Sequence, residues 1–437
     1  MIENQVESRA EPISASDNQR LPSLDFIRGI AVMGILVANI VAFGQPLSAY
    51  IWPGGFLTDH GTVSNWLWVA QLTLIDGKMR GLFALLFGAG MILFLDRART
   101  RNSGRWLQAR RLVWLFAFGY AHFLFISKTD ILTVYATCGL IALLFVNWRP
   151  KTQLWVGIVI YLLGAVKDVV VWGRMYAISS GGMAEAPGGM SDMAAEMREA
   201  GLADSQLETA LIQAGDYGGW VAHNIAEHWS QPLLSWFQNG LEIIPLILIG
   251  MALYRLGLFD GRLDRRRQAR RGWIGLLVGF AATLAIALWT LGEGFDYLAV
   301  LWSYDGTSRV ASLPMVLGLA ALLALWGPHA NGWLGTRTAA AGRMAFSNYL
   351  GTSILMLFVF HGWALGLFGE LTRPALYGVA LATCAIMLAW SKPWLAHYRF
   401  GPLEWLWRCL TYARVFPLRR HSPGSHEVQG ASHQRSA

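Results

Sequence analysis

Charged side chains are scarce in this sequence. Of its 437 residues, 14% are Asp, Glu, Lys or Arg, whereas 54% are hydrophobic and 21 are tryptophan. A soluble domain carries roughly 25% charged residues. The composition therefore excludes a chain of ordinary soluble domains and indicates a polytopic membrane protein.

Cysteine is also rare. The three cysteines, Cys138, Cys384 and Cys409, lie far apart and show no C-x-x-C spacing, which argues against a disulfide framework or a thiolate zinc site. The first twenty residues lack a short apolar stretch followed by a small-residue cleavage site, so we expect no cleaved signal peptide. No P-loop, G-x-S-x-G, H-E-x-x-H or dinucleotide-binding motif occurs, so the enzyme classes that depend on them lack support.

Apolar segments, in contrast, recur along the whole chain. A helix needs about 20 apolar residues to cross about 30 Å of hydrocarbon, where lipid cannot satisfy open backbone groups. The predicted fold class is therefore all-α, with about ten transmembrane helices. The ten predicted segments are residues 27–47, 78–95, 112–128, 131–147, 153–172, 238–257, 273–291, 310–327, 344–367 and 375–391.

The charges between these segments predict the orientation. Residues 96–111 carry six arginines and one acid, and residues 259–272 carry six arginines and two acids. Residues 173–235 carry eight acids and two arginines. Because basic loops stay in the cytoplasm, ten spans with both termini cytoplasmic place every loop correctly. We interpret the net charge of +8 as this topology signal and expect no nucleic-acid partner.

The same pattern divides the chain into five parts. We expect two five-helix membrane halves that flank an external segment, with a polar tail at each end. The external segment begins with a Gly/Pro-rich loop and becomes amphipathic and helical from about residue 191 to residue 214. The predicted parts are a cytoplasmic tail at 1–20, a membrane half at 21–172, the external segment at 173–235, a second membrane half at 236–420 and a disordered cytoplasmic tail at 421–437.

Five phrases of the sequence resemble one known family. They are LDFIRG at 24–29, LFALLFGAG at 82–90, RRLVWLFAFGYAHFLF with a following DIL at 110–132, GRMAFSNY at 342–349 and FGPLEWLWRCLTY at 400–412. Together they resemble the YeiB-like family, bacterial inner-membrane proteins that contain the domain of unknown function 418. The resemblance implies a multi-pass protein of the bacterial inner membrane and assigns that domain to the second half of the chain.

The opening L-D-x-x-R-G of this family is similar to that of transmembrane acyltransferases, including glucosaminide N-acetyltransferases and the acyltransferase-3 group. Those families transfer an acyl group from a cytosolic donor to an acceptor reached from the other side of the membrane, commonly a sugar hydroxyl or amine. The similarity is an analogy between short motifs. It implies an acyl-CoA donor and an envelope glycan or lipid acceptor.

Asp25 and Arg28 stand three residues apart at the start of the first apolar segment. A guanidinium at the inner mouth of a helix suits the phosphates of coenzyme A, and Asp25 would fix its rotamer. Arg343 is a further candidate for the donor site. The alternative is that Asp25 and Arg28 form an ordinary i, i+3 pair at the membrane boundary. The helix with Glu404 and Arg408 either anchors at the inner leaflet or closes the mouth near Arg28.

His122 lies eleven residues beyond Arg111, about 16 Å along a helix and so near the middle of the membrane. An ionisable group at this depth is a candidate functional residue, and we predict that His122 is the general base of acyl transfer. A neutral histidine hydrogen-bonded between helices is the alternative. Asp130 would orient the histidine or the acceptor, or would cap the next helix.

Four further residues are candidates for the acceptor side: His60, Lys78, Arg80 and Glu242. His60 is an alternative base, while snorkelling of their long side chains also explains Lys78 and Arg80. Glu242 also fits a structural role. His223 and His228 are five residues apart and so do not share a helical face, and we predict no metal site.

Three classes of function remain open from the sequence. They are a transmembrane acyltransferase, a transporter or lipid-handling protein with a polar path, and an envelope factor without catalysis. Only the transferase needs phosphate-binding groups at the inner mouth. No resident cofactor is predicted, and acyl-CoA would be a donor substrate. The predicted partners are membrane lipid, acyl-CoA and the envelope acceptor, and a homodimer is left open.

Overall fold

The computed structural model describes residues 21–58, 60–99, 104–183 and 189–420, so both predicted tails lie outside the described residues. This part of the chain is helical, with one isolated bridge between Tyr398 and Arg419. The elements are α2 (Pro22–Gly44), α3 (Leu47–Ile51), η2 (Pro53–Gly55), α4 (Thr62–Leu74), α5 (Lys78–Arg99), α6 (Arg105–Phe125), α7 (Leu132–Ala142), η3 (Leu143–Phe145), α8 (Pro150–Ser179), α9 (Met190–Gln213), α10 (Tyr217–His228), α11 (Gln231–Arg255), α12 (Arg265–Gly292), α13 (Tyr297–Leu301), η4 (Trp302–Thr307), α14 (Ser308–Trp326), η5 (Gly327–His329), α15 (Trp333–Arg343), α16 (Ala345–Phe360), α17 (Arg373–His397) and α18 (Pro402–Tyr412).

The all-α prediction is confirmed, and each of the ten predicted segments falls on a helix. Within the described part of the chain, seven helical segments are long and apolar enough to cross a membrane. The number is eight if α15 and α16, which meet at 87°, form one bent span. The remaining two predicted segments correspond to α6, which begins with several arginines, and to the short α7. The structure therefore supports a membrane protein with seven or eight such helices.

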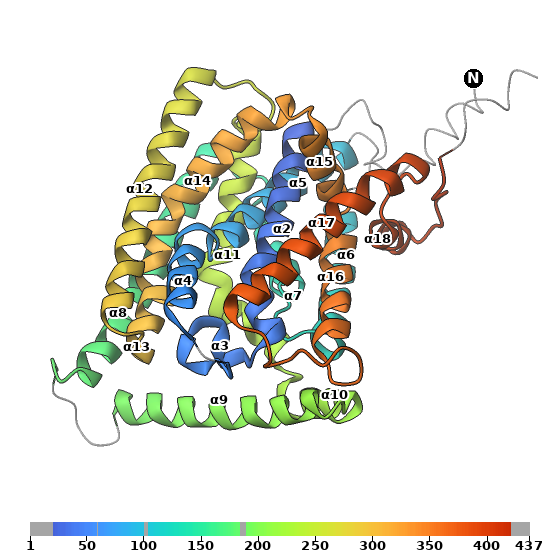
Figure 1. Cartoon of the computed structure of the whole chain (residues 1–437). Helices are drawn as coiled ribbons and strands as arrows, with labels where there is room; N and C mark the ends of the chain where they lie inside the picture. The colour runs from blue at the N-terminus through green and yellow to red at the C-terminus, as the bar shows by residue number, and fades with distance from the viewer. Residues whose placement is uncertain (1–20, 59, 100–103, 184–188, 421–437) are drawn as a thin grey trace, which may run out of the picture.

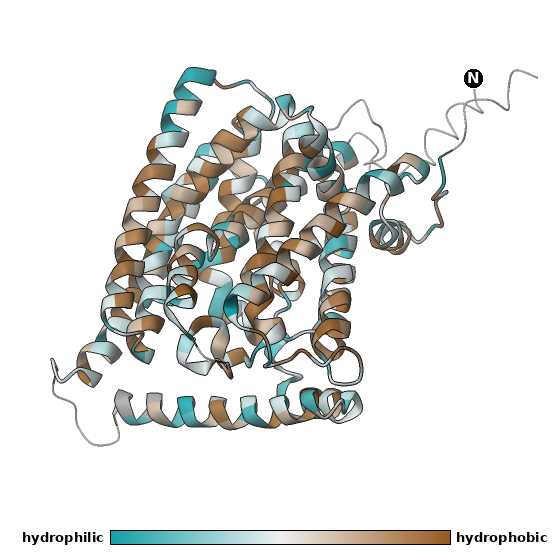
Figure 2. Ribbon diagram, in the orientation of Figure 1, coloured by the Kyte–Doolittle hydropathy of each residue, from teal (hydrophilic) through white to brown (hydrophobic). Residues whose placement is uncertain are grey.

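The outer helices of the bundle expose their apolar side chains. The most apolar stretch of α12 is only 22% buried, and that of α8 is 28% buried. Figure 2 shows hydrophobic residues along the outer sides of these helices. In water such exposure would cause aggregation, whereas in a membrane it is the surface that contacts lipid. Helices α2, α5, α11 and α14 are more deeply buried and form the centre.

The two ends of the bundle differ in charge. The connection that contains Phe259 meets the start of α2, because the hydroxyl of Ser23 donates to the carbonyl of Phe259 at 2.6 Å. Leu21, Arg97, Arg111 and Arg408 gather around one cavity at this same end, which we call the arginine-rich end. At the opposite end α9 lies across the bundle and covers it (Figure 1). The predicted amphipathic helix of the external segment corresponds to α9.

Glycines allow two central helices to touch. The phrase FGAG predicts close helix contact, and Gly88 of α5 meets the backbone of Ile247 in α11. Gly250 of α11 makes the reciprocal contact, because a methyl group on it would lie 2.0 Å from the carbonyl oxygen of Leu85 in α5. Gly90 of the same phrase has open space around it instead. The contact between α5 and α11 therefore depends on Gly88 and Gly250.

Substitution of Gly250 by alanine should push α5 and α11 apart. We expect Gly250→Ala to lower the free energy of unfolding by about 1–3 kcal/mol, the usual effect of overpacking. The measurement is unfolding by SDS in mixed micelles. Gly351→Ala is the matched control, because no atom lies within 4 Å of the added methyl group. The control should be neutral or slightly stabilising, since alanine favours helix, and equal losses in both variants would contradict the packing argument.

Candidate functional site

A cavity of about 250 Å³ opens at the arginine-rich end and runs into the bundle. Its mouth is rich in guanidinium groups, whereas its inner part is lined by Phe83, Leu115, Tyr135 and Tyr349. Only two acids, Asp25 and Glu404, also line it. The arginines that line it are Arg28, Arg97, Arg111, Arg343, Arg399 and Arg408. The cavity therefore combines a cationic mouth with an apolar interior.

Asp25 and Arg28 form the ion pair that the sequence predicts, with Arg28 Nη1 3.2 Å from Asp25 Oδ1. The Arg28 side chain is 29% exposed and lines the cavity, as does Arg343. Arg111 is held differently, because its guanidinium lies 4.2 Å from the centre of the Trp407 ring and 5.0 Å from that of Phe94. These contacts position Arg111 and leave its N–H edge available for an anion.

Helix α18 closes one side of this mouth. Glu404 accepts hydrogen bonds from the backbone N–H groups of Phe346 and Ser347, at 2.8 and 3.1 Å, and from the hydroxyl of Ser347. The indole N–H of Trp407 donates to the carbonyl of Arg111 at 2.9 Å. Of the two interpretations of this tail helix, the structure favours the one in which it borders the mouth near Arg28.

The structure brings His122 and Asp130 together in the interior. His122 Nδ1 lies 3.0 Å from Asp130 Oδ1, and the two side chains are 1% and 0% exposed. The other carboxylate oxygen of Asp130 accepts from the backbone N–H of Thr133 at 2.9 Å, so Asp130 also caps α7. Because a carboxylate accepts, Nδ1 is the nitrogen that carries a proton toward Asp130, and in the neutral form of the ring Nε2 would be the basic nitrogen.

The basic nitrogen is free to act. Within the part of the chain that the structure describes, His122 Nε2 is buried and has no hydrogen-bond partner. The ring of Tyr349, which lines the cavity, lies 5.3 Å from the imidazole, centre to centre. The Tyr349 hydroxyl accepts from the N–H of Ile131 and donates to the carbonyl of Thr129, both at 3.3 Å. Tyr349 thus fixes both neighbours of Asp130 beside the cavity.

A second, smaller cavity of about 60 Å³ lies beneath α9. It is bordered by the connection between α6 and α7, including Thr129, and by Trp220 and His361. His122 and Asp130 line neither cavity. They lie between them, because Thr129 borders the second cavity and Ile131 the first.

His60 and Lys78 belong to a separate polar cluster. Arg373 Nε donates to His60 Nε2 at 3.2 Å, and His60 Nδ1 lies 2.9 Å from Asn65 Oδ1. Lys78 is fully buried and donates to the carbonyl of Leu72 at 2.6 Å, so it does not snorkel to the membrane surface. Neither His60 nor Lys78 lines either of the two cavities.

Arg80 and Glu242 lie in a network of buried charges. Arg80 Nη2 is 2.8 Å from Glu242 Oε2, and Arg309 Nε is 3.7 Å from the same oxygen. Arg309 also pairs with Asp168 at 2.6 Å and with Asp305 at 3.1 Å. Arg80 and Glu242 therefore contact each other and lie outside the two cavities, which supports the structural interpretation of Glu242.

Three arginines of the mouth are not among the predicted site residues. From the sequence, Arg97 and Arg111 are interpreted only as part of a basic connection that signals topology, and Arg399 is given no role in a site. Arg111 does carry a detectable signal, because it stands at the start of an apolar run as Arg28 does. A basic residue at that position can mark a boundary and line a site at once. The sequence offered no means of telling these roles apart.

Comparison with known proteins shows the family. The model of the family described as "Protein of unknown function (DUF418)" matches residues 253–414. The uncharacterised protein YeiB of Escherichia coli (strain K12) is 32% identical over 409 residues, which cover 91% of this chain and 98% of that protein. The chain belongs to the YeiB-like DUF418 family.

Two further proteins are similar to this chain over most of their length. YxaH of Bacillus subtilis (strain 168) is 28% identical, over 92% of this chain and 97% of that protein. An uncharacterised 39.9 kDa protein of Bacillus acidopullulyticus is 26% identical, over 92% and 96%. No solved structure matches. The fold and the cavities of this DUF418 protein are therefore the starting point for its function.

Loss of the Glu404 carboxylate should loosen the mouth of the large cavity. We expect Glu404→Ala to lower the free energy of unfolding by about 3 kcal/mol, because it leaves the first N–H groups of α16 without their acceptor. The measurement is again SDS unfolding in mixed micelles. Glu370→Ala removes an exposed carboxylate and should change stability by less than about 0.5 kcal/mol. Similar losses in the two variants would contradict the capping role.

Proposed function

We propose that this protein is an acyltransferase of the bacterial inner membrane. In this proposal it moves an acyl group from a cytosolic acyl-CoA to an acceptor that approaches from the α9 end. The observation that carries the proposal is the position of the His122–Asp130 pair, between a large cationic cavity and a small cavity at the other end. The names of the relatives are silent on activity, so the proposal rests on this geometry and on the similarity of the L-D-x-x-R-G motif.

The large cavity suits a donor with phosphate groups and a long arm. Guanidinium groups bind phosphates through paired hydrogen bonds, and in the described part of the chain arginines outnumber acids in the lining of this cavity. In the proposal, Arg28, Arg111 and Arg343 hold the nucleotide part at the mouth. The apolar interior, lined by Phe83 and Leu115, then takes the thioester arm toward His122.

The chemistry is direct transfer with general base catalysis. His122 Nε2 takes the proton from an acceptor hydroxyl or amine, whose oxygen or nitrogen forms a bond to the thioester carbon. The bond between carbon and sulfur breaks, and the CoA thiolate leaves with the proton from His122. Asp130 holds the correct tautomer and stabilises the imidazolium that forms between the two proton transfers. The small cavity admits only the reactive group of the acceptor and a few water molecules.

The proposal also includes the topology. We assign the remaining two crossings to α6 and α7, which gives ten, and place the arginine-rich end in the cytoplasm. Leu21 and Tyr412 line the same cavity, so the two ends of the described chain lie at the same end of the bundle. An even number of crossings requires that the two ends of the chain lie on the same side of the membrane. Acyl-CoA is made in the cytosol, where the cationic mouth would then open.

Acetyl-CoA should bind to the purified protein through the mouth arginines. We expect Arg28→Ala and Arg111→Ala each to weaken binding at least tenfold, since a charge-assisted hydrogen bond contributes about 1.5–3 kcal/mol. Isothermal titration in detergent measures this. Arg105→Ala is the matched control, because Arg105 is exposed on the same helix as Arg111 and does not line the cavity. No binding by the wild type, or equal binding by all variants, would rule out the donor site.

Turnover should depend on His122 far more than donor binding does. We expect His122→Ala to reduce release of CoA thiol from acetyl-CoA, with glucosamine as the acceptor probe, by at least about 100-fold. The affinity for acetyl-CoA should stay within about twofold. Asp130→Asn should also slow release, because an amide can stabilise the wrong tautomer. His329→Ala, which removes an exposed histidine, should leave the rate unchanged. Full activity in His122→Ala would exclude it as the base.

A further inference from the structure

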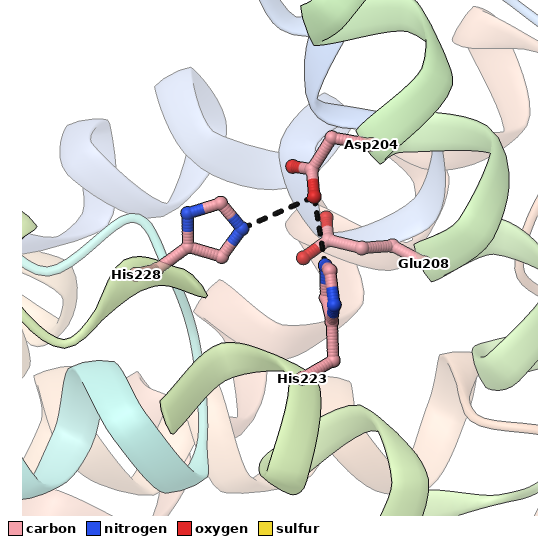
Figure 3. A group of neighbouring side chains, drawn as sticks. All are labelled: Asp204, Glu208, His223 and His228. Atoms are coloured by element: carbon pink, nitrogen blue, oxygen red, sulfur yellow. Dashed lines mark hydrogen bonds and ion pairs between the residues drawn. The ribbon is translucent and has the colours of Figure 1, made fainter. Parts of the chain in front are cut away.

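Four potential metal ligands converge at the α9 end of the molecule. Asp204 and Glu208 come from α9, and His223 and His228 from α10; one ligand atom from each lies within 4.8 Å of all the others. Figure 3 shows the two rings directed at the Asp204 carboxylate. Asp204 Oδ1 is 2.7 Å from His223 Nε2 and 3.2 Å from His228 Nε2. The five-residue spacing of His223 and His228 predicts that they lie on separate faces of a helix, and so predicts no metal site. In the structure His228 is the last residue of α10, and both imidazole rings reach Asp204.

The donor set suits a zinc ion. Zinc takes imidazole nitrogens and carboxylate oxygens at about 2.0–2.2 Å, usually in a tetrahedron whose corners are about 3.3 Å apart. The four ligand atoms lie within 4.8 Å of one another, so the side chains would move slightly closer together on binding. The four side chains are between 9% and 31% exposed, so an ion can reach them from solvent. The amide nitrogen of Gln231 lies 2.8 Å from His228 Nδ1, and rotation of this amide would place its oxygen there to accept from Nδ1 when Nε2 binds the ion.

In the structure, the ammonium group of Lys128 is a positive charge beside the carboxylates of Asp204 and Glu208. This ammonium contacts Glu208 and lies 3.5 Å from Asp204 Oδ2. One lysine balances only one of the two carboxylates, whereas a divalent ion balances both. Lys128 extends from the connection between α6 and α7 and also borders the small cavity. An ion in the cluster would therefore compete with Lys128 and release it.

We propose that Asp204, Glu208, His223 and His228 form a zinc site in which Zn²⁺ takes the place of the Lys128 ammonium. The bound ion ties α9 to α10. Helix α10 is itself held to α6, because Asn224 donates to the carbonyls of Phe123 and Leu124 at 2.9 and 3.1 Å. The released Lys128 then adds an unbalanced positive charge beside the small cavity. The site does not depend on acyl transfer.

The test uses untagged full-length protein in detergent, stripped with EDTA and titrated with Zn²⁺ against a chromophoric chelator. We expect one Zn²⁺ per chain, and at least tenfold weaker binding in His223→Gln and in Asp204→Asn. Lys128→Met should bind at least threefold more tightly, because it lacks the competing ammonium. His397→Gln removes an exposed histidine elsewhere and should bind as the wild type does. Thermal unfolding without zinc checks that each variant is folded.

Each other outcome would overturn the site. Binding that survives both His223→Gln and Asp204→Asn would mean that zinc lies elsewhere. Binding by Lys128→Met but not by the wild type would mean that the lysine is the permanent cation of the cluster. Absence of binding in the wild type and in every variant, Lys128→Met included, would mean that the four side chains do not form a zinc site. If a ligand variant unfolds without zinc, Glu208→Gln replaces it, because its side chain belongs to the same donor set.

Discussion

Helix α16 begins inside the bundle, and its first N–H groups need an acceptor that lipid cannot supply. Glu404 supplies it, and this interaction determines much of the arrangement at the arginine-rich end. It fixes α18 beside α16, which places Trp407 against Arg111 and Arg408 in the wall of the cavity. The bend of 87° between α15 and α16 is possible for the same reason. A carboxylate that serves a helix end thus also shapes the arginine-lined mouth of the large cavity.

The same requirement accounts for the charges in the middle of the bundle. Removal of a charge from water costs several kcal/mol unless a partner compensates it. Arg309 meets Asp168, Asp305 and Glu242, which come from three different elements. Arg309 stands at the start of α14, so these pairs join α8, α11 and η4 to that helix. Within the described part of the chain, Nε of Arg309 and Nε of Arg80 are buried without a hydrogen bond, so the network is held by its ion pairs.

The sequence predicts the fold well because its signals are local. Apolar segments locate the helices, and the charges of the loops predict that the arginine-rich connections lie at the same end of the bundle. The pairing of polar residues is different, since it depends on contacts between distant segments. Arg80 and Glu242 are 162 residues apart, and nothing in the sequence links them. His122 and Asp130 are only eight residues apart, on the two sides of the connection between α6 and α7. For this pair, one predicted role of Asp130 is to orient the histidine, and the two side chains are in contact.

The two cavities differ in size and in chemistry, and the proposed transfer assigns a different ligand to each of them. Here one cavity is about 250 Å³ with an arginine-lined mouth, and the other is about 60 Å³ and carries Lys128 and Glu208. In the proposed function the donor enters the first cavity and the reactive group of the acceptor enters the second. The His122–Asp130 pair lies between the two cavities, which is where direct acyl transfer would need its base.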